Sequence, residues 1–145
     1  MPVPVVPMPN PWKAVLELLR AHPDLPEALQ GETPAGRSRV CATLPPEFPD
    51  ELPLLQVNQV PGGRRNVPLR LATALFDLHL YDEDLFDAME QARFVAAVVQ
   101  SLEGRVTAEA GFTVVRLTDE PFPLEDPDTR TPRAVISISA TYRPI

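Results

Sequence analysis

Residues 130–144, RTPRAVISISATYRP, alternate almost strictly between apolar and polar side chains. Successive side chains of a β-strand point to opposite faces, so this stretch predicts a strand with one core face and one polar face. Val135 is the one exception. The core face would carry Ala134, Ile136, Ile138, Ala140 and Tyr142, and the polar face Arg133, Ser137, Ser139, Thr141 and Arg143.

The same alternation occurs in the middle of the chain, in TALFDLHLY (73–81). It is typical of an antiparallel sheet that is covered on one side only. We therefore predict a second two-faced strand here. Its core face holds Ala74, Phe76, Leu78 and Leu80, and its polar face holds Thr73, Asp77, His79 and Tyr81.

Two segments have helical periodicity. Asn10 and Pro11 are a typical N-cap and first helical residue, and the apolar residues after them predict a short helix that ends near His22. Asp84 and Asp87 favour the start of a longer helix, which we expect to end at Gly104. Its apolar stripe comprises Leu85, Phe86, Met89, Ala92, Val95, Ala96, Val98, Val99 and Leu102.

The remaining elements are separated by prolines, of which the chain has 19. Residues 38–44 and 52–60 are predicted strands that could form a hairpin, 61–68 (PGGRRNVP) a loop, and 111–119 a further strand. The proline-rich acidic segment before the last strand is expected to be a loop. We divide the chain into an extended proline-rich arm (1–10) and a single domain (11–145). The expected fold is α+β, with a mostly antiparallel sheet of about four to five strands packed by one long helix, and a short N-terminal helix.

Charge and composition exclude several classes of protein. The net charge of −7, with one lysine, argues against a protein that grips nucleic acid, since phosphate binding requires clustered Lys and Arg. No apolar run is long enough to cross a bilayer, and the start lacks the basic region of a signal peptide, so we expect the chain to remain in the cytoplasm. The single cysteine, Cys41, is expected to be a buried core residue.

The sequence contains none of the common catalytic or nucleotide-binding motifs. Asp77 and His79 lie two apart on a predicted strand and could bind a metal ion together with a third ligand, although a solvated strand face would have the same pattern. We therefore assign no catalytic residue, metal site or cofactor. A small metal-dependent enzyme using Asp77 and His79 is the alternative from another functional class.

The arginines and acidic residues suggest contacts between proteins. Arginine is enriched in interfaces because its planar guanidinium group pairs with carboxylates. If copies pack head to tail, arginines of one subunit could meet the acidic cluster of the next, and such a contact can close a ring. The alternative is scattered, solvated charge. The predicted interface residues are Arg64, Arg65, Asp82, Glu83, Asp84, Arg130, Arg133 and Arg143.

Several segments, in this order, carry a resemblance to one known family. They are PWKAVLELLRAHP, VCATLPPEFPDELPLLQV, PGGRR, ATALFDLHLYDED, LFDAMEQARFVAAVVQSLEG and the last strand introduced by PR. The chain resembles the tail terminator (tail-completion) proteins of long-tailed, siphovirus-type phages, particularly those of phages that infect actinobacteria. The resemblance covers about residues 10–145 and lies in organisation, without a strict motif.

This resemblance implies an α+β subunit of a hexameric ring. The ring would sit on the last ring of tail-tube protein, stop tube growth and offer a surface to the head-side connector, in the neck of the virion. Genome DNA would pass through the lumen without specific binding. Another neck component, such as a head-closure or adaptor protein, and an interaction domain of a bacterial secretion or contractile apparatus remain alternatives.

Overall fold

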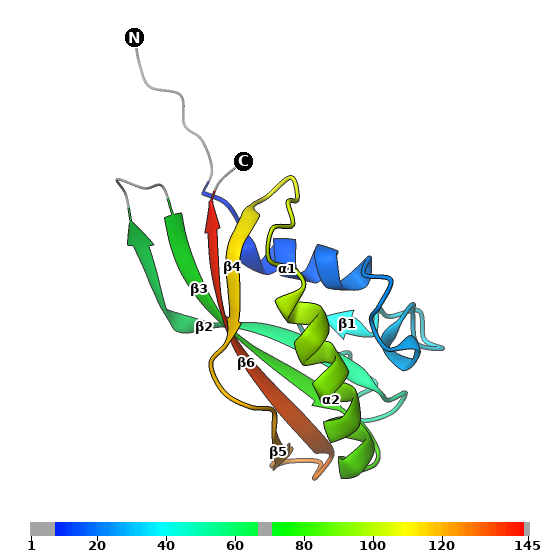
Figure 1. Cartoon of the computed structure of the whole chain (residues 1–145). Coiled ribbons are helices and arrows are strands. Elements are labelled where there is room, and N and C mark those ends of the chain that lie inside the picture. The colour runs from blue at the N-terminus through cyan, green and yellow to red at the C-terminus, as the bar shows by residue number, and fades with distance from the viewer. Residues whose placement is uncertain (1–7, 67–70, 144–145) are drawn as a thin grey trace.

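The computed structural model is an α+β fold built on one six-stranded sheet, and it describes residues 8–66 and 71–143 (Figure 1). The strand order is β1-β2-β3-β6-β4, and β5 also pairs with β6. The α+β class is confirmed. The elements are α1 (Pro11–Arg20), the short 3-10 helix η1 (Glu27–Leu29), β1 (Val40–Cys41), β2 (Leu54–Asn66), β3 (Leu71–Tyr81), α2 (Leu85–Gln100), β4 (Gly111–Leu117), β5 (Phe122–Glu125) and β6 (Pro132–Arg143).

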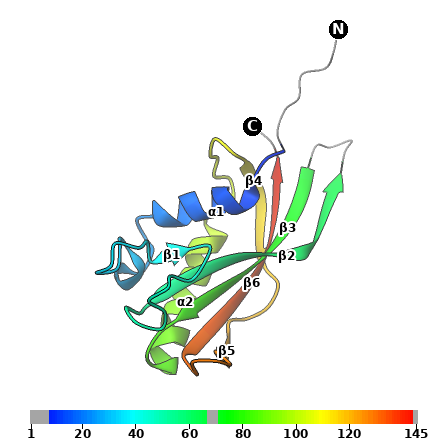
Figure 2. The same cartoon turned by 180° about the vertical axis from the view of Figure 1, so that it is seen from behind.

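Both helices cover the same face of the sheet, as the two opposite views show (Figures 1 and 2). Their buried side chains form one core with the alternating apolar residues of β3 and β6, as the sequence predicted. The short helix therefore also packs on the sheet, and the expectation of one covering helix was incomplete. Trp12 fastens α1 to the sheet, because its indole Nε1 donates a hydrogen bond to the Val57 carbonyl oxygen at 2.6 Å.

The starts of the two helices are capped as expected. The Asn10 side chain accepts a hydrogen bond from the backbone N–H of Lys13, and the Asp84 carboxylate accepts from those of Phe86 and Asp87. The second helix ends at Gln100, before Gly104. Phe86 does not belong to the apolar stripe, because its side chain is 83% exposed.

The first pair of strands differs from the prediction. Val40–Cys41 is a two-residue strand that runs parallel to β2, so the predicted hairpin is wrong. Parallel neighbours need a connection of about a dozen residues or more. The proline-rich segment 42–53 provides that length and returns the chain to the same end of the sheet.

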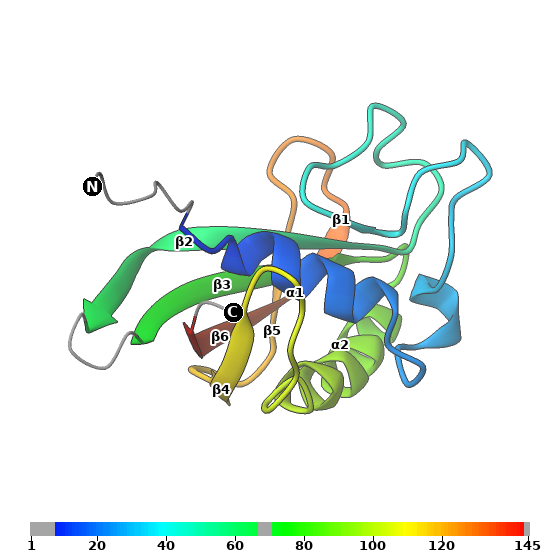
Figure 3. The same cartoon turned by 90° about the horizontal axis from the view of Figure 1, so that it is seen from above.

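The predicted loop at residues 61–68 is also wrong over its described part. The second strand continues through Asn66, with a bulge between Val60 and Arg64, and residues 67–68 lie outside the described residues. Gly62 has φ +116°, which favours glycine, and a Cβ on Gly63 would overlap the Thr73 carbonyl oxygen. The glycines thus allow the bulge instead of ending the strand. The resulting β2–β3 hairpin extends beyond α1 (Figure 3).

The other face of the sheet carries no helix among the described residues and is only partly covered. The segment 44–53 reaches over one end of it, where Phe48 packs edge-on against Tyr81 with ring centroids 4.8 Å apart. This contact accounts for the burial of Tyr81, at 2% exposure, and Val135 on the same face is also buried, at 3%. The segment expected to be a loop contains β5, which pairs with the first residues of β6.

Candidate functional site at the two ends of the sheet

The eight predicted interface residues lie at two opposite ends of the sheet. Strand register places Arg64 and Arg65 opposite Thr73 and Ala72, and Ala72 pairs with Tyr142, next to Arg143. The other five lie near the start of β6: Asp82 donates its backbone N–H to the Pro132 carbonyl oxygen. We call the end with Arg64, Arg65 and Arg143 the arginine end, and the end with Asp82, Glu83, Asp84, Arg130 and Arg133 the acidic end.

The arginine end is built on strands. All three of its arginines are exposed, and none belongs to an ion pair within 4.0 Å among the described residues. Arg65 Nη1 contacts the Met8 sulfur at 3.3 Å. Arg116 on β4 is also exposed, but it pairs with Ser139 in the middle of β6 and so lies outside this end.

The acidic end combines two parts of the chain that are distant in sequence. The carboxylates at the start of α2 lie beside the turn between β5 and β6, because Asp82 and Glu125 both neighbour Pro132. Glu125, Asp126 and Asp128 therefore join the cluster predicted from the sequence. Sequence reasoning missed these three residues. A contiguous run of acidic residues is visible in a sequence, but the proximity of two segments that are distant in sequence is not.

Burial raises the pKa of Asp82, and the neighbouring carboxylates of Asp87, Glu83 and Asp84 raise it further, although a hydrogen bond from the Glu83 N–H opposes them. The pKa of Asp126 is lowered instead, mainly by the backbone N–H of Thr129, which donates to its carboxylate at 2.9 Å. Asp126 thus organises the turn before β6. Asp82 is therefore the carboxylate whose charge is disfavoured, by burial first and by its neighbours second.

The two arginines of the acidic end differ from the exposed ones at the other end. Arg133 is half-buried in β6, and its Nη1 lies 3.5 Å from the Tyr81 hydroxyl oxygen, while Arg130 is in the turn with φ +57°. The structure therefore does not gather the predicted arginines on one surface. Arg130 and Arg133 are neighbours of the acids they were expected to meet across an interface.

The candidate metal ligands lie on the partly covered face. Asp77 Oδ1 accepts a hydrogen bond from the Ser137 hydroxyl at 2.8 Å. Burial lowers the pKa of His79, the positive charge of Arg133 lowers it further, and Asp77 partly opposes both. Within residues 8–66 and 71–143, no group of three His, Cys, Asp or Glu side chains is placed to bind a metal ion.

The hydrogen bond between His22 and Ser101 has the length found in a catalytic pair, but its donor and acceptor are reversed. His22 Nδ1 accepts the Asp24 backbone N–H at 3.0 Å, so Nε2 carries the proton and donates to Ser101 Oγ at 2.9 Å. The Ser101 hydroxyl donates to the Val98 carbonyl oxygen. An imidazole that activates a serine must accept its proton. This contact instead joins the segment after α1 to the end of α2.

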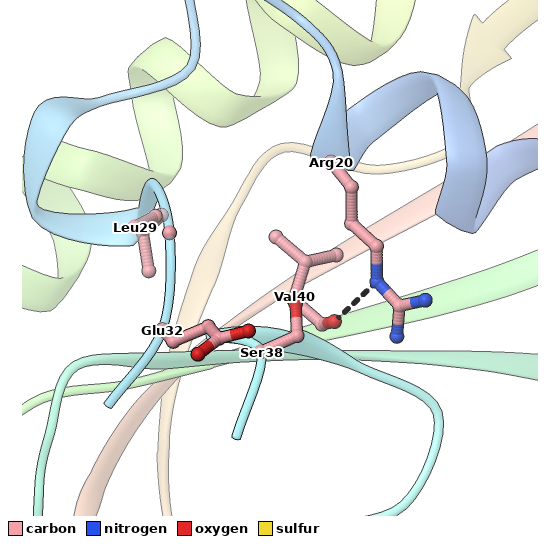
Figure 4. A pocket seen from close by; sticks show the side chains of 6 residues that line it. Arg20, Leu29, Glu32, Ser38 and Val40 are labelled. Atoms are coloured by element: carbon pink, nitrogen blue, oxygen red, sulfur yellow. Dashed lines mark hydrogen bonds between the residues drawn. The ribbon is translucent and has the colours of Figure 1, made fainter. Parts of the chain in front are cut away.

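An open pocket of about 310 Å³ lies between the end of α1, η1 and β1 (Figure 4). Arg20 Nε donates to the Val40 carbonyl oxygen at 2.9 Å beside it, and Glu32 and Ser38 provide the other polar groups of the lining. Within the described part of the chain, no histidine lines this pocket to activate Ser38. Nearby, Cys41 is buried as predicted, and burial raises its pKa to about 11.

Comparison with known proteins finds a likeness of fold. A solved structure described as the virion of a native gene transfer agent particle contains a chain that matches with a TM-score of 0.58. The two chains share a fold. The match covers 88% of this chain and 90% of the other, at 16% sequence identity.

No known family matches the chain by sequence, and no curated protein matches it. Among the described residues, no helix is both long and apolar enough to cross a membrane.

Proposed function

We propose that the protein is the tail terminator of a long-tailed, phage-like particle. Six copies form a ring on the end of the tail tube, stop the addition of tube protein and present a docking surface to the head-side connector. The observation that carries this proposal is the likeness to a chain of a gene transfer agent virion, because it extends over nine-tenths of both chains. A likeness of that extent concerns the whole arrangement of elements, not one motif.

The distribution of charge also supports the proposal. A ring needs two different surfaces on each subunit that recognise each other, since identical surfaces would give closed pairs. The arginine end and the acidic end of the sheet are two such surfaces, and they lie at opposite ends of β6. The protein would act through the shape of the assembly, without catalysis, a metal or another cofactor.

The proposed partners follow from this role. They are other copies of the chain, the tail-tube protein and the head-side connector proteins, and genome DNA passes through the lumen without specific binding. The ring would assemble in the host cytoplasm and remain in the neck of the virion. The net charge of −7 suits a channel that must not retain DNA.

Deletion of the gene from a particle-producing strain tests the proposal. We expect overlong tails of variable length that are not joined to heads, when the particles are viewed by electron microscopy. Complementation with the intact gene should restore uniform tails. Tails of normal length joined to heads in the deletion strain would overturn the proposal.

The same experiment separates the alternatives. A head-closure or adaptor protein would leave finished tails of normal length beside unfilled or leaking heads. A metal-dependent enzyme using Asp77 and His79 would instead hold a stoichiometric transition metal that is lost in His79→Ala. Metal analysis of the purified protein detects that outcome directly.

A further inference from the structure

We infer that neighbouring copies bind head to tail through the charged ends of the sheet, with the arginine end of one copy seated on the acidic end of the next. This inference rests on the proposed function, since it names the contact that would build the proposed ring. The occupant of the arginine end is therefore a second copy of this chain.

The two ends cannot neutralise each other within one molecule. They are separated by the length of β6, whose 12 residues span about 37 Å at the usual rise of a strand. Exposed charges are screened beyond about 8 to 10 Å at moderate ionic strength. Their attraction becomes appreciable only when the arginine end of one copy approaches the acidic end of another.

The arginine end presents its charges in a fixed arrangement. Arg64 and Arg65 lie on β2 beyond the bulge, and Arg143 ends β6, so β3 lies between them. Their backbones are held by the sheet, which limits the entropy lost when the guanidinium groups order against a partner. Guanidinium groups favour carboxylates because each can donate two parallel hydrogen bonds.

The acidic end offers a matching surface. Glu83 at the start of α2 and Glu125 on β5 are both exposed, and they flank Asp82, which is the partly buried member of the cluster. Charges of one sign held close together repel each other, and a cationic partner removes that cost. The two surfaces therefore complement each other in sign and differ in the elements that build them.

The same arrangement disfavours a symmetric dimer. Pairing two arginine ends, or two acidic ends, would place like charges opposite each other. A contact between unlike ends is heterologous, and repetition of it yields a ring when the rotation between neighbours closes. Two copies would not satisfy the contact, because the pair would leave one arginine end and one acidic end free.

Charge reversal of either end tests the inference in full-length protein. One variant combines Arg64→Glu with Arg143→Glu, and the other combines Glu83→Arg with Glu125→Arg, all at exposed positions. We expect each variant alone to associate at least about tenfold more weakly than the wild type, as found for close interface charge pairs. The measurement is sedimentation velocity at low salt, with circular dichroism to show that both variants are folded.

Mixing the two variants gives the most direct test of the contact. One variant carries two glutamates at its arginine end and the other carries two arginines at its acidic end, so the introduced charges meet their opposites only where unlike variants touch. A mixture should therefore regain assembly with strict alternation of the two chains. Native mass spectrometry would then find equal numbers of each. Arg93→Glu is the control, because it makes the same kind of charge change at an exposed position in the middle of α2, and it should assemble like the wild type.

Several outcomes would overturn the inference. They are a wild type that stays monomeric at low salt, variants that assemble like the wild type, and a mixture that does not recover. Binding of duplex DNA that disappears in the arginine variant, without any effect on self-association, would assign the arginine end to nucleic acid instead. Assembly through other surfaces would refute this contact while the tail-length test could still support a terminator, so the two failures are distinguishable.

Discussion

Cys41 should react slowly with thiol reagents, because it is buried. Burial raises the pKa of its thiol to about 11, and the positive charge of Arg20 only partly opposes this effect. At about pH 8 the thiolate fraction would be about 100-fold smaller than that of a cysteine at the ordinary value of 9.0. We expect alkylation by iodoacetamide in the native protein to be slower by at least about that factor than in the unfolded protein.

The exposed neighbour Thr43 offers the control for this experiment. Thr43→Cys in a Cys41→Ser background should react in the native state nearly as fast as in the unfolded state. Native Cys41 that reacts at the speed of this control would show that the thiol is accessible, contrary to its burial.

His79 should make the stability of the protein depend on pH. Burial and then Arg133 lower the pKa of His79 in the folded chain, while Asp77 raises it, so the unfolded chain binds a proton more readily, at the ordinary value of 6.5. The free energy of unfolding should therefore fall as the pH is lowered through 6.5. His79→Gln removes this titration, and we expect a smaller loss of stability between about pH 7.5 and about pH 5.5.

Urea denaturation at several pH values measures this difference. The second histidine, His22, is present in both proteins, so its contribution cancels in the comparison. If the two proteins lose stability in parallel over this range, then the charge on His79 is not penalised by folding.

At the scale of elements, the glycine bulge determines the course of β2. A Cβ on Gly63 would overlap the Thr73 carbonyl oxygen on the paired strand, and neither backbone can move without breaking the ladder beyond the bulge. We expect Gly63→Ala to lower the free energy of unfolding by about 1 to 3 kcal/mol. Chemical denaturation measures the change.

Gln59→Ala, at an exposed position of the same strand before the bulge, is the control and should change stability by less than about 0.5 kcal/mol. A Gly63→Ala protein as stable as this control would show that β2 and β3 separate there at little cost. The pairing of β2 with β3 around Arg64 and Arg65 would then be weaker than the strand register indicates.

Elements with a complete local pattern could be predicted from the sequence. The strands β3 and β6 alternate along nearly their whole length, and α2 combines an Asp84 cap with helical periodicity. The direction of β1 could not be predicted, since it depends on how a long proline-rich segment returns across the sheet. The strand β5 carries a proline and pairs only with β6, so it has no alternation of buried residues to reveal it.

The candidate site was predicted in part for similar reasons. Asp82, Glu83 and Asp84 are adjacent in sequence, so their proximity needs no fold. The approach of Glu125 and Asp126 to them follows from the pairing of β5 with β6, which local patterns do not contain. Arg130 and Arg133 were grouped with the other arginines by residue type alone. They lie before and at the start of β6, whereas Arg143 lies at its end, so the length of the strand separates them.

At the scale of the whole molecule, separated charge matters more than net charge. A chain with a net charge of −7 should repel its own copies, and a uniformly acidic surface would keep it monomeric. The exposed arginines gathered at one end of the sheet replace this repulsion with attraction in one orientation only, in which the arginine end of one copy faces the acidic end of the next. Oriented attraction combined with general repulsion favours a specific assembly over nonspecific aggregation.

Assembly through these ends should therefore depend on both salt and pH. Raising sodium chloride from about 50 mM to about 500 mM should weaken association, because the exposed charges are screened. Acidification should weaken it as well. An arginine partner lowers the pKa of the carboxylates it contacts, so assembly is favoured above their pKa in the free chain and is lost as the pH falls through their pKa in the assembly.

Asp82 should shift this pH window upward. Its pKa in the free chain is raised above the ordinary 3.8 by burial and by the neighbouring carboxylates, so the wild type should begin to dissociate at a higher pH than isolated aspartates would dictate. In Asp82→Asn this raised titration is removed, and we expect dissociation to begin at lower pH. Sedimentation velocity across a pH series measures both proteins. Identical profiles would mean that the acidic end does not bear the contact, because a contact made elsewhere has no reason to respond to this carboxylate.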